Sequence, residues 1–421
     1  MEFLQKLFRK KTIAHSAITF SGTFINGALG IIFFILLARF LGPEDFGLIS
    51  IAILSLTLIA DIADVGINTG IINFVSKYIS EDKNRAYKYL KLGFQYKLLS
   101  WFVIIILGFL FSDFISQTIF RKPELSEYLK LSLIGVGGAL LFSFVTNSLL
   151  ALQKYWTWSF INIFSNGLRL AILVFLIAAG FLNVYNSLIT YILLPFFGFF
   201  IGILFLPLSF LKVKNEQSKF SDFFSYNKWI ALSIIISAIY SRVDSFISAS
   251  FLSIEQVGYY SVAVQLNSVI PQFVYALAVV IAPKIASYKS HAEVFKYIKK
   301  IQLLTLGIAS VGLFAIPLSF YFIPLIYTNS YNQSVFPFII LLISQLIFLI
   351  SIPAHQSIFY YFSSPKIFVV FSVFQFSVVF TSAIILIPRY GIIGAAFAVL
   401  LGSIFNLITT NIWMLKQFKK L

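Results

Sequence analysis

The most informative polar residues of this chain lie inside long apolar stretches, where a charged side chain needs a partner or an anionic ligand. Arg169 follows Asn162 and Asn166 at helical spacing, which places the three side chains on one face. A charge at mid-depth in a bilayer costs on the order of 3 kcal/mol or more. Guanidinium and amide groups donate hydrogen bonds to anions. The row predicts either a binding face for an anionic ligand or a structural ion pair, with Asp61 as the candidate partner.

Three carboxylates in comparable apolar stretches are candidates for coupling to a proton or a cation. Asp61 and Asp64 are three residues apart and share a helix face, whereas Asp244 lies in the second half of the chain. A carboxylate inside a membrane typically marks an ion pathway, a proton relay or an ion pair. A solvated helix end is the alternative explanation for Asp61 and Asp64, and for Asp64 it is the preferred one.

Arg242 lies two residues from Asp244, which is about 200° around a helix, so these two side chains cannot pair. Its charge is met either by a partner in another helix or by the lumen of a cavity. Rows of Ser, Asn and Gln in other apolar stretches either line a wet lumen or hydrogen-bond neighbouring helices. The predicted substrate-binding residues are Arg169, Arg242, Asn162, Asn166, Asn26 and Gln265, and the predicted ion-coupling residues are Asp61, Asp64 and Asp244.

The composition requires that these residues sit in a membrane protein. Of the 421 residues, 59% are hydrophobic and 11% are charged, and the mean hydropathy is +0.94. A soluble domain carries about 25% charged residues. A soluble enzyme, a secreted module and a nucleic-acid-binding domain are therefore excluded. The chain has no cysteine, and its three histidines lack metal-ligand spacing, so we predict neither a metal site nor a cofactor.

Apolar stretches of about 20 residues predict an all-α integral membrane protein with about twelve transmembrane helices. Of the 31 Lys and Arg residues, 24 fall on the side of the termini and 5 on the other. The positive-inside rule then places both termini in the cytoplasm, with anionic inner-leaflet lipid as the counter-charge. The predicted spans are 14–38, 46–66, 98–115, 128–150, 158–180, 185–211, 228–250, 256–283, 301–326, 335–360, 366–388 and 391–415. Residues 71–79 are amphipathic and predict a helix on the inner leaflet.

The chain contains an internal repeat at half its length. Residues 40–52 read FLGPEDFGLISIA and residues 251–263 read FLSIEQVGYYSVA, with six identities at a constant offset. The repeat predicts two six-helix lobes in the same orientation, with a central cavity and alternating access by rocking. The predicted domains are an N-terminal lobe at 1–211, a cytoplasmic linker at 212–227 and a C-terminal lobe at 228–421.

Three segments carry a resemblance to a known family. LLARFLGPEDFGLISIA at 36–52, ADVGINTGIINFVSKYIS at 63–80 and YSRVDSFISASFLSIEQVGYYSVAVQL at 240–266 resemble the polysaccharide-type flippases. These belong to the multidrug/oligosaccharidyl-lipid/polysaccharide exporter superfamily, which also contains the MATE-type multidrug exporters. The likeness runs through nearly the whole chain, and it fixes the superfamily better than the substrate.

The resemblance implies a cell-membrane flippase that moves lipid-linked oligosaccharides, such as undecaprenyl-pyrophosphate carriers, from the inner to the outer leaflet for cell-surface polysaccharide synthesis. In this interpretation Arg169 holds the anionic head group, the Asn rows bind sugars, and Asp61 or Asp244 couples to a proton or cation. The main alternative is a multidrug/cation antiporter on the same fold. A membrane polymerase or ligase would need a longer outer loop, and a passive structural partner would tolerate loss of every intramembrane charge.

Overall fold

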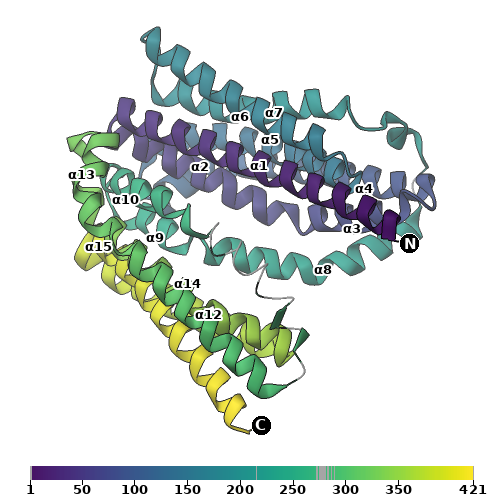
Figure 1. Ribbon diagram of the computed structural model, residues 1–421. Helices are drawn as coiled ribbons and strands as arrows, with labels where there is room; N and C mark the ends of the chain where they lie inside the picture. Colours follow the sequence, from purple (N-terminus) through teal and green to yellow (C-terminus); the bar gives the residue numbers. More distant parts are fainter. Residues whose placement is uncertain are drawn as a thin grey trace. The chain divides into compact units, whose positions relative to one another are not determined.

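The structure is a computed structural model that describes residues 2–214, 216–271, 274, 281, 284–285, 287–288 and 290–420. Its elements are helices joined by short turns (Figure 1). The first part of the chain forms α1 (Glu2–Leu41), α2 (Pro43–Asp64), α3 (Ile67–Tyr78), α4 (Lys83–Phe114), α5 (Ser126–Ala151), α6 (Tyr155–Ala178), α7 (Val184–Ile203) and α8 (Gln217–Tyr240). The second part forms α9 (Val243–Phe251), α10 (Ile254–Asn267), α12 (His291–Gly312), α13 (Ala315–Tyr327), α14 (Val335–Gln356) and α15 (Pro365–Lys420).

Most of these helices are long and apolar enough to cross a membrane. Eight pass on length and hydropathy within the described residues, and two bent pairs bring the number to ten. The bent pairs, α8 with α9 and α12 with α13, correspond to the predicted spans 228–250 and 301–326. The predicted span 256–283 begins with α10, but much of its second half lies outside the described residues. The all-helical membrane architecture is confirmed.

The long last helix accounts for two of the predicted spans. The apolar segment of α15 has 55 residues, which is roughly 80 Å of helix against a hydrocarbon core of about 30 Å. Gly391 interrupts it with φ 60° and ψ −138°, a conformation outside the helical region. Gly394 packs closely against the backbone carbonyl of Leu386, so the chain reverses there. The predicted spans 366–388 and 391–415 lie on the two sides of this reversal.

By backbone packing the chain forms two compact units. Unit 1 comprises residues 1–41 and 48–242, and unit 2 comprises residues 42–47 and 243–421. The chain passes from one unit to the other at the break between α8 and α9, within a predicted span. The domain limits at 211 and 228 remain a prediction from the internal repeat.

In unit 1, α5 is the central helix because three small residues let its neighbours approach closely. Gly135 packs against Leu56 of α2, and Gly137 packs against the indole ring of Trp101 in α4. Gly138 lies beside Phe196 of α7. Close approach of this kind replaces the hydrophobic effect as the source of helix association in lipid. α5 is accordingly buried along most of its length.

The amphipathic segment 71–79 does not lie on a lipid surface, so that expectation is wrong. Ile71 and Val75 of α3 are fully buried in a core that also contains Tyr89 of α4. Phe74 stacks on Tyr89 with ring centroids 4.5 Å apart. An apolar helix face binds whichever apolar surface is closest, and here that surface is protein.

In unit 2, two equivalent glycines make the same close contact, each with a residue from the other copy of the internal repeat. A Cβ atom on Gly47 would overlap the backbone of Ile254, and one on Gly258 would overlap the backbone of Pro43. Gly47 matches Gly258 in the internal repeat, and Pro43 matches Ile254 at the same offset. A self-complementary contact of this kind is what a two-fold relation between two segments produces. It supports the parallel repeat.

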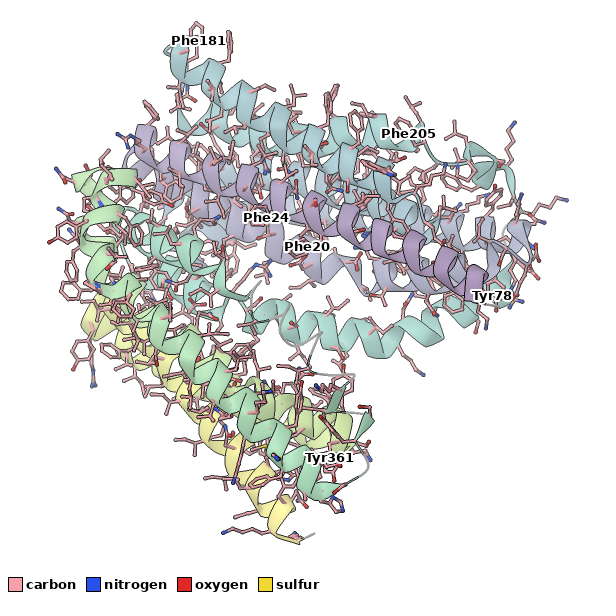
Figure 2. All side chains as sticks on the ribbon, in the orientation of Figure 1. Phe20, Phe24, Tyr78, Phe181, Phe205 and Tyr361 are labelled. Atoms are coloured by element: carbon pink, nitrogen blue, oxygen red, sulfur yellow. The ribbon has the colours of Figure 1, made fainter. Side chains whose placement is uncertain are left out.

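Large apolar side chains cover the outer surface, as a lipid-facing surface requires. Phe20 and Phe24 of α1 are 70% and 69% exposed, and Phe181 and Phe205 of unit 1 are also exposed (Figure 2). A soluble protein of this size would hide such residues. Together with the long apolar helices, this surface shows a multi-pass membrane protein.

Candidate functional site

The candidate site is a cavity of about 180 Å³ within unit 1, between α2, α5, α6 and α7. Gly135 of α5 lines it, and Pro195 lies inside α7 at the same place. Three charged side chains reach this small cavity. Its lining residues are Leu56, Thr57, Ala60, Asp61, Gly135, Ala139, Arg169, Tyr191, Pro195 and Arg242.

The Arg169 guanidinium is held by aromatic faces rather than by a carboxylate. Its central carbon lies 4.9 Å from the ring centroid of Phe33 and 4.8 Å from that of Tyr191. Ring faces attract a guanidinium electrostatically and leave its N–H edge free to donate. Within the described residues Arg169 makes no ion pair, and its Nε has no hydrogen-bond partner. Part of its donor capacity is therefore unused.

The predicted row of amides on α6 positions this arginine. Arg169 donates to the Oδ1 atom of Asn166, and the Nδ2 atom of Asn166 donates to Oδ1 of Asn26 at 2.5 Å. Asn162 instead donates to the backbone carbonyl of Trp158 one turn earlier, at 2.8 Å. Asn26, Asn166 and Arg169 thus form one chain of contacts across α1 and α6, and Asn162 supports the helix.

Asp61 pairs with Arg242 and not with Arg169. The Arg242 guanidinium, two residues beyond the end of α8, lies 2.8 Å from Oδ2 of Asp61. The side chains are 26% and 51% exposed, so both ends of this pair remain accessible. Both predicted environments of Arg242 are therefore present: it has a partner in another helix, and it also lines the cavity. Among the cavity-lining residues two cations face one carboxylate, which leaves a positive balance.

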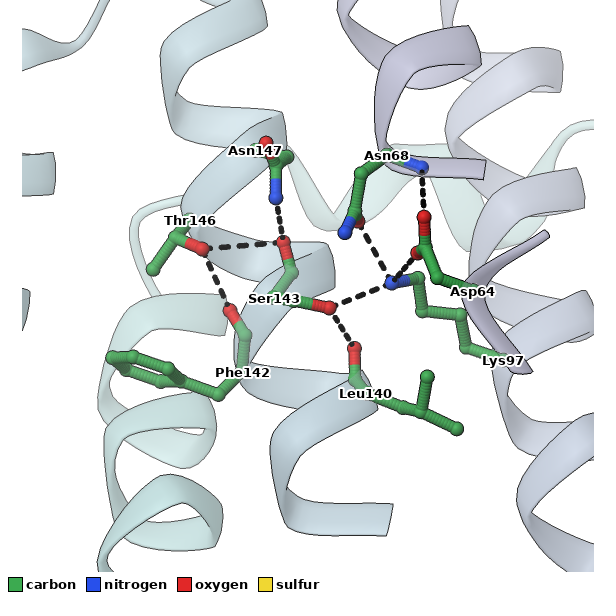
Figure 3. Close-up of polar contacts among 8 residues, drawn as sticks. All are labelled: Asp64, Asn68, Lys97, Leu140, Phe142, Ser143, Thr146 and Asn147. Carbon is green, nitrogen blue, oxygen red and sulfur yellow. Dashed lines mark hydrogen bonds and ion pairs between the residues drawn. The ribbon is translucent and has the colours of Figure 1, made fainter. Parts of the chain in front are cut away.

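Asp64 is not a solvated helix end. It is buried, and its Oδ1 atom lies 2.6 Å from Nζ of Lys97, which is fully buried in α4 (Figure 3). Lys97 also donates to Oδ1 of Asn68 at 2.7 Å and to Oγ of Ser143 at 2.6 Å. The sequence interpretation counted Lys97 among the cytoplasmic loop charges because it directly precedes an apolar run. α4 in fact begins at Lys83, so Lys97 lies 14 residues inside the helix.

The remaining predicted residues belong to unit 2. Asp244 is buried at the start of α9, and the hydroxyl of Tyr260 donates to its Oδ2 atom at 2.5 Å. No cation pairs with Asp244 among the described residues. Gln265 is half-buried in α10, where its backbone carbonyl accepts a hydrogen bond from Ser268.

Unit 2 also contains a buried polar network around His355, whose pairings were not predicted from the sequence. The Nε2 atom of His355 lies 2.7 Å from Oδ1 of Asn406, and the Nδ2 atom of Asn406 donates to Gln375 at 2.8 Å. The three residues come from α14 and the two arms of α15. The only sequence signal for this network was that each of its three polar residues lies inside a predicted apolar span. In the part of the chain that is described, no three His, Asp or Glu side chains gather as a metal-ligand set.

Comparison with known families agrees with this architecture. The family model for polysaccharide biosynthesis proteins matches residues 13–289, which is more than half of the chain. No curated protein matches the chain.

Solved structures share the fold at low sequence identity. An inward-facing MATE-family multidrug resistance transporter of the MOP superfamily has a TM-score of 0.74 and 13% identity, with 94% of this chain and 95% of that chain covered. The lipid II flippase MurJ in an inward closed conformation also has a TM-score of 0.74, with 18% identity and coverage of 96% and 89%. A MOP-superfamily transporter from Pyrococcus furiosus, described as having a binding pocket of reverse polarity, has a TM-score of 0.63, 15% identity and coverage of 97% and 96%.

Proposed function

Because the chain belongs to the polysaccharide biosynthesis protein family, we propose that it flips lipid-linked oligosaccharide units from the cytoplasmic to the outer leaflet of the cell membrane. Such a lipid has a sugar head that cannot cross hydrocarbon unaided and a pyrophosphate that carries negative charge. Its transporter needs a polar path with cationic groups at membrane depth. The fold that this chain shares with MurJ supports a flippase of this class.

The observation that carries the proposal is Arg169 in the cavity of unit 1. Its charge is stabilised by two aromatic rings and an amide, so binding an anion requires no carboxylate to be displaced from it. A planar guanidinium binds phosphate oxygens through two parallel N–H donors. We assign the pyrophosphate of the lipid to Arg169, and we assign its sugars to Asn166, Asn162, Asn26 and Gln265.

Arg242 supplies a second, exchangeable cation in this mechanism. In the structure its partner is Asp61, which is half exposed to the cavity. An arriving pyrophosphate competes with Asp61 for Arg242, and a free Asp61 is then able to take up a proton or a cation. Asp244 is the corresponding candidate of unit 2 for coupling, and the Asp64 carboxylate is already paired with Lys97.

We propose two six-helix lobes, at 1–211 and 228–421, that alternate in access around a central path, with 212–227 as the cytoplasmic linker. The repeat at half the chain length supports this division. Reaction chemistry is not required of any residue in the mechanism, because flipping moves an intact lipid from one leaflet to the other.

The experiment measures on which leaflet the lipid-linked oligosaccharides of the native host accumulate, using a membrane-impermeant glycan label. Deletion of the gene should cause accumulation on the cytoplasmic side. The wild-type gene should relieve it, whereas Arg169→Ala, expressed at the same level, should not. Arg169→Lys should relieve it only in part, because an ammonium cannot form the same two-donor contact. Relief by Arg169→Ala would remove the anchor role.

The alternative function, a multidrug/cation antiporter on the same fold, makes a different prediction. Its cavity would favour acidic and apolar groups, and its expression should confer drug resistance. The positive balance of the cavity in unit 1 favours an anionic ligand. An unchanged leaflet distribution after deletion, together with a gain of drug resistance on expression, would establish the antiporter instead.

A further inference from the structure

A second cluster of charged and polar groups lies apart from the proposed binding residues, around the buried ammonium of Lys97. Three oxygen atoms surround Nζ, at 2.6 Å for Asp64, 2.7 Å for Asn68 and 2.6 Å for Ser143 (Figure 3). They come from the end of α2, the start of α3 and the middle of α5. Three separate helices thus present oxygens to a single point, and the side chain of a fourth helix fills it.

All three oxygens accept hydrogen bonds from Lys97. Ser143 donates its own proton to the backbone carbonyl of Leu140 at 2.9 Å, which leaves its lone pairs to Lys97. An ammonium has three donors and no acceptor, and here each donor has one oxygen. A carboxylate, an amide oxygen and a hydroxyl are also the ligand types that hard cations take in proteins.

We propose that Asp64, Asn68 and Ser143 form a cation site within unit 1, and that Lys97 occupies this site as a tethered cation. The site has the chemistry of a site for a free ammonium or alkali-metal ion, but the chain supplies the ion itself. Lys97 is fully buried and its ammonium is completely satisfied, so a free ion has neither space nor a vacant ligand there. Unit 1 therefore needs no free cation at this position.

Shortening the side chain should convert the tethered site into one that takes a free cation. Lys97→Ala removes the ammonium and three of the four stem carbons, and leaves a cavity that ends at three oxygens. An engineered cavity of matching shape binds a small molecule that replaces the lost atoms. n-Propylammonium reproduces most of the stem and the charged head of lysine, so it is the probe of choice, and Na⁺ and Li⁺ are the alkali-metal probes.

The readout is the melting temperature of the purified full-length protein in lipid nanodiscs, which does not depend on transport. Lys97→Ala should lower Tm by about 5 °C or more, because one partner of a buried pair is left without compensation. Propylammonium or Na⁺ should restore Tm with a saturable dose dependence. The wild-type Tm should not respond to propylammonium, because Lys97 already fills the site.

Matched variants separate a cation site from a general effect of salt or amine. Lys88→Ala removes a lysine from the same helix that pairs with Glu216 at the surface, and its Tm should not respond to propylammonium. Lys97→Met keeps the stem, leaves no cavity and should not be rescued. Lys97→Ala combined with Asp64→Asn lacks the counter-charge and should also lose the rescue. A Lys97→Ala protein that responds to no cation would overturn the proposal, as would a wild-type Tm that rises with propylammonium.

A second measurement applies if Lys97→Ala fails to fold. The chain contains no cysteine, so Lys97→Cys introduces a single thiol. Alkylation with 2-bromoethylamine forms a thioether, releases bromide and rebuilds an ammonium at nearly the length of lysine. The aminoethylated protein should regain the wild-type Tm, and a neutral alkylating reagent of similar size should not restore it. Equal recovery with both reagents would contradict a cation site.

Discussion

At the scale of single residues, the aromatic contacts of Arg169 have a measurable consequence. Tyr191→Leu removes one of the two ring faces that hold the guanidinium. Because a cation–π contact contributes about 0.5–2 kcal/mol, binding of an anionic prenyl ligand should weaken by about 2- to 30-fold. Calorimetric titration of the purified protein with farnesyl pyrophosphate measures this. Tyr191→Phe keeps the ring, removes only the hydroxyl that also contacts Arg169, and should bind more tightly than Tyr191→Leu. Equal affinities for all three proteins would contradict the role of the ring.

The ion pair of Asp61 with Arg242 gives a prediction of opposite sign. Asp61→Asn frees Arg242 and removes the only carboxylate among the cavity-lining residues, so the same ligand should bind more tightly. A partly exposed pair contributes about 0.2–1 kcal/mol, which corresponds to a gain of up to about 5-fold. Glu216→Gln removes a carboxylate from a surface pair with Lys88 and should leave the affinity unchanged. Weaker binding by Asp61→Asn would show that the carboxylate takes part in the binding of the ligand.

Residues with a helical spacing were predictable from the sequence, and pairings across helices were not. The face shared by Asn166 and Arg169 follows from their separation of three residues. The partner of Asp61 depended on which helix end lies opposite it, and the structure places Arg242 there. Lys97 was missed because a hydropathy window reads a lysine before an apolar run as a loop residue, whereas a buried carboxylate at the right depth stabilises it inside the helix.

At the scale of helices, the reciprocal glycine contact in unit 2 predicts a matched pair of effects. Gly47→Ala and Gly258→Ala each place a methyl group against a backbone carbonyl, which cannot move without shifting a helix. Each should destabilise the protein by about 1–3 kcal/mol, and the two should be similar because the contacts are equivalent. Thermal unfolding in nanodiscs measures this. Gly27→Ala and Gly30→Ala in α1 have open space around the added methyl group and serve as controls with little change.

The lengths of helices were less predictable than their existence. Hydropathy located an apolar run from residue 98, but α4 continues in the N-terminal direction to Lys83 because its first turns pack on α3 and α5. The bends within two of the spans could not be predicted from hydropathy, because two half-helices on either side of a bend have the same composition as one straight helix. Gly391 shows the converse case, in which two spans follow each other with only one residue outside the helical conformation between them.

At the scale of the whole molecule, composition and repetition determine more than local propensity does. An apolar fraction of 59% requires lipid as the solvent, and in lipid only helices or closed barrels satisfy every backbone group. The repeat at an offset of 211 then predicts equivalent positions in two halves. The paired contacts of Gly47 and Gly258 meet that expectation with backbone atoms, which makes the repeat a structural property as well as a sequence property.

The charge distribution predicts the orientation of the whole chain, and the absence of cysteine makes this testable with two single-thiol variants. Ser330→Cys and Ser80→Cys both replace exposed serines in short connections between α-helices. With cytoplasmic termini, residue 330 faces outward and residue 80 faces inward, because the lysine-rich segments remain on the cytoplasmic side. A membrane-impermeant maleimide should label Ser330→Cys in intact cells and Ser80→Cys only after permeabilisation. The reverse labelling pattern would show that the termini face outward. It would contradict the predicted orientation and the direction of flipping in the proposed function.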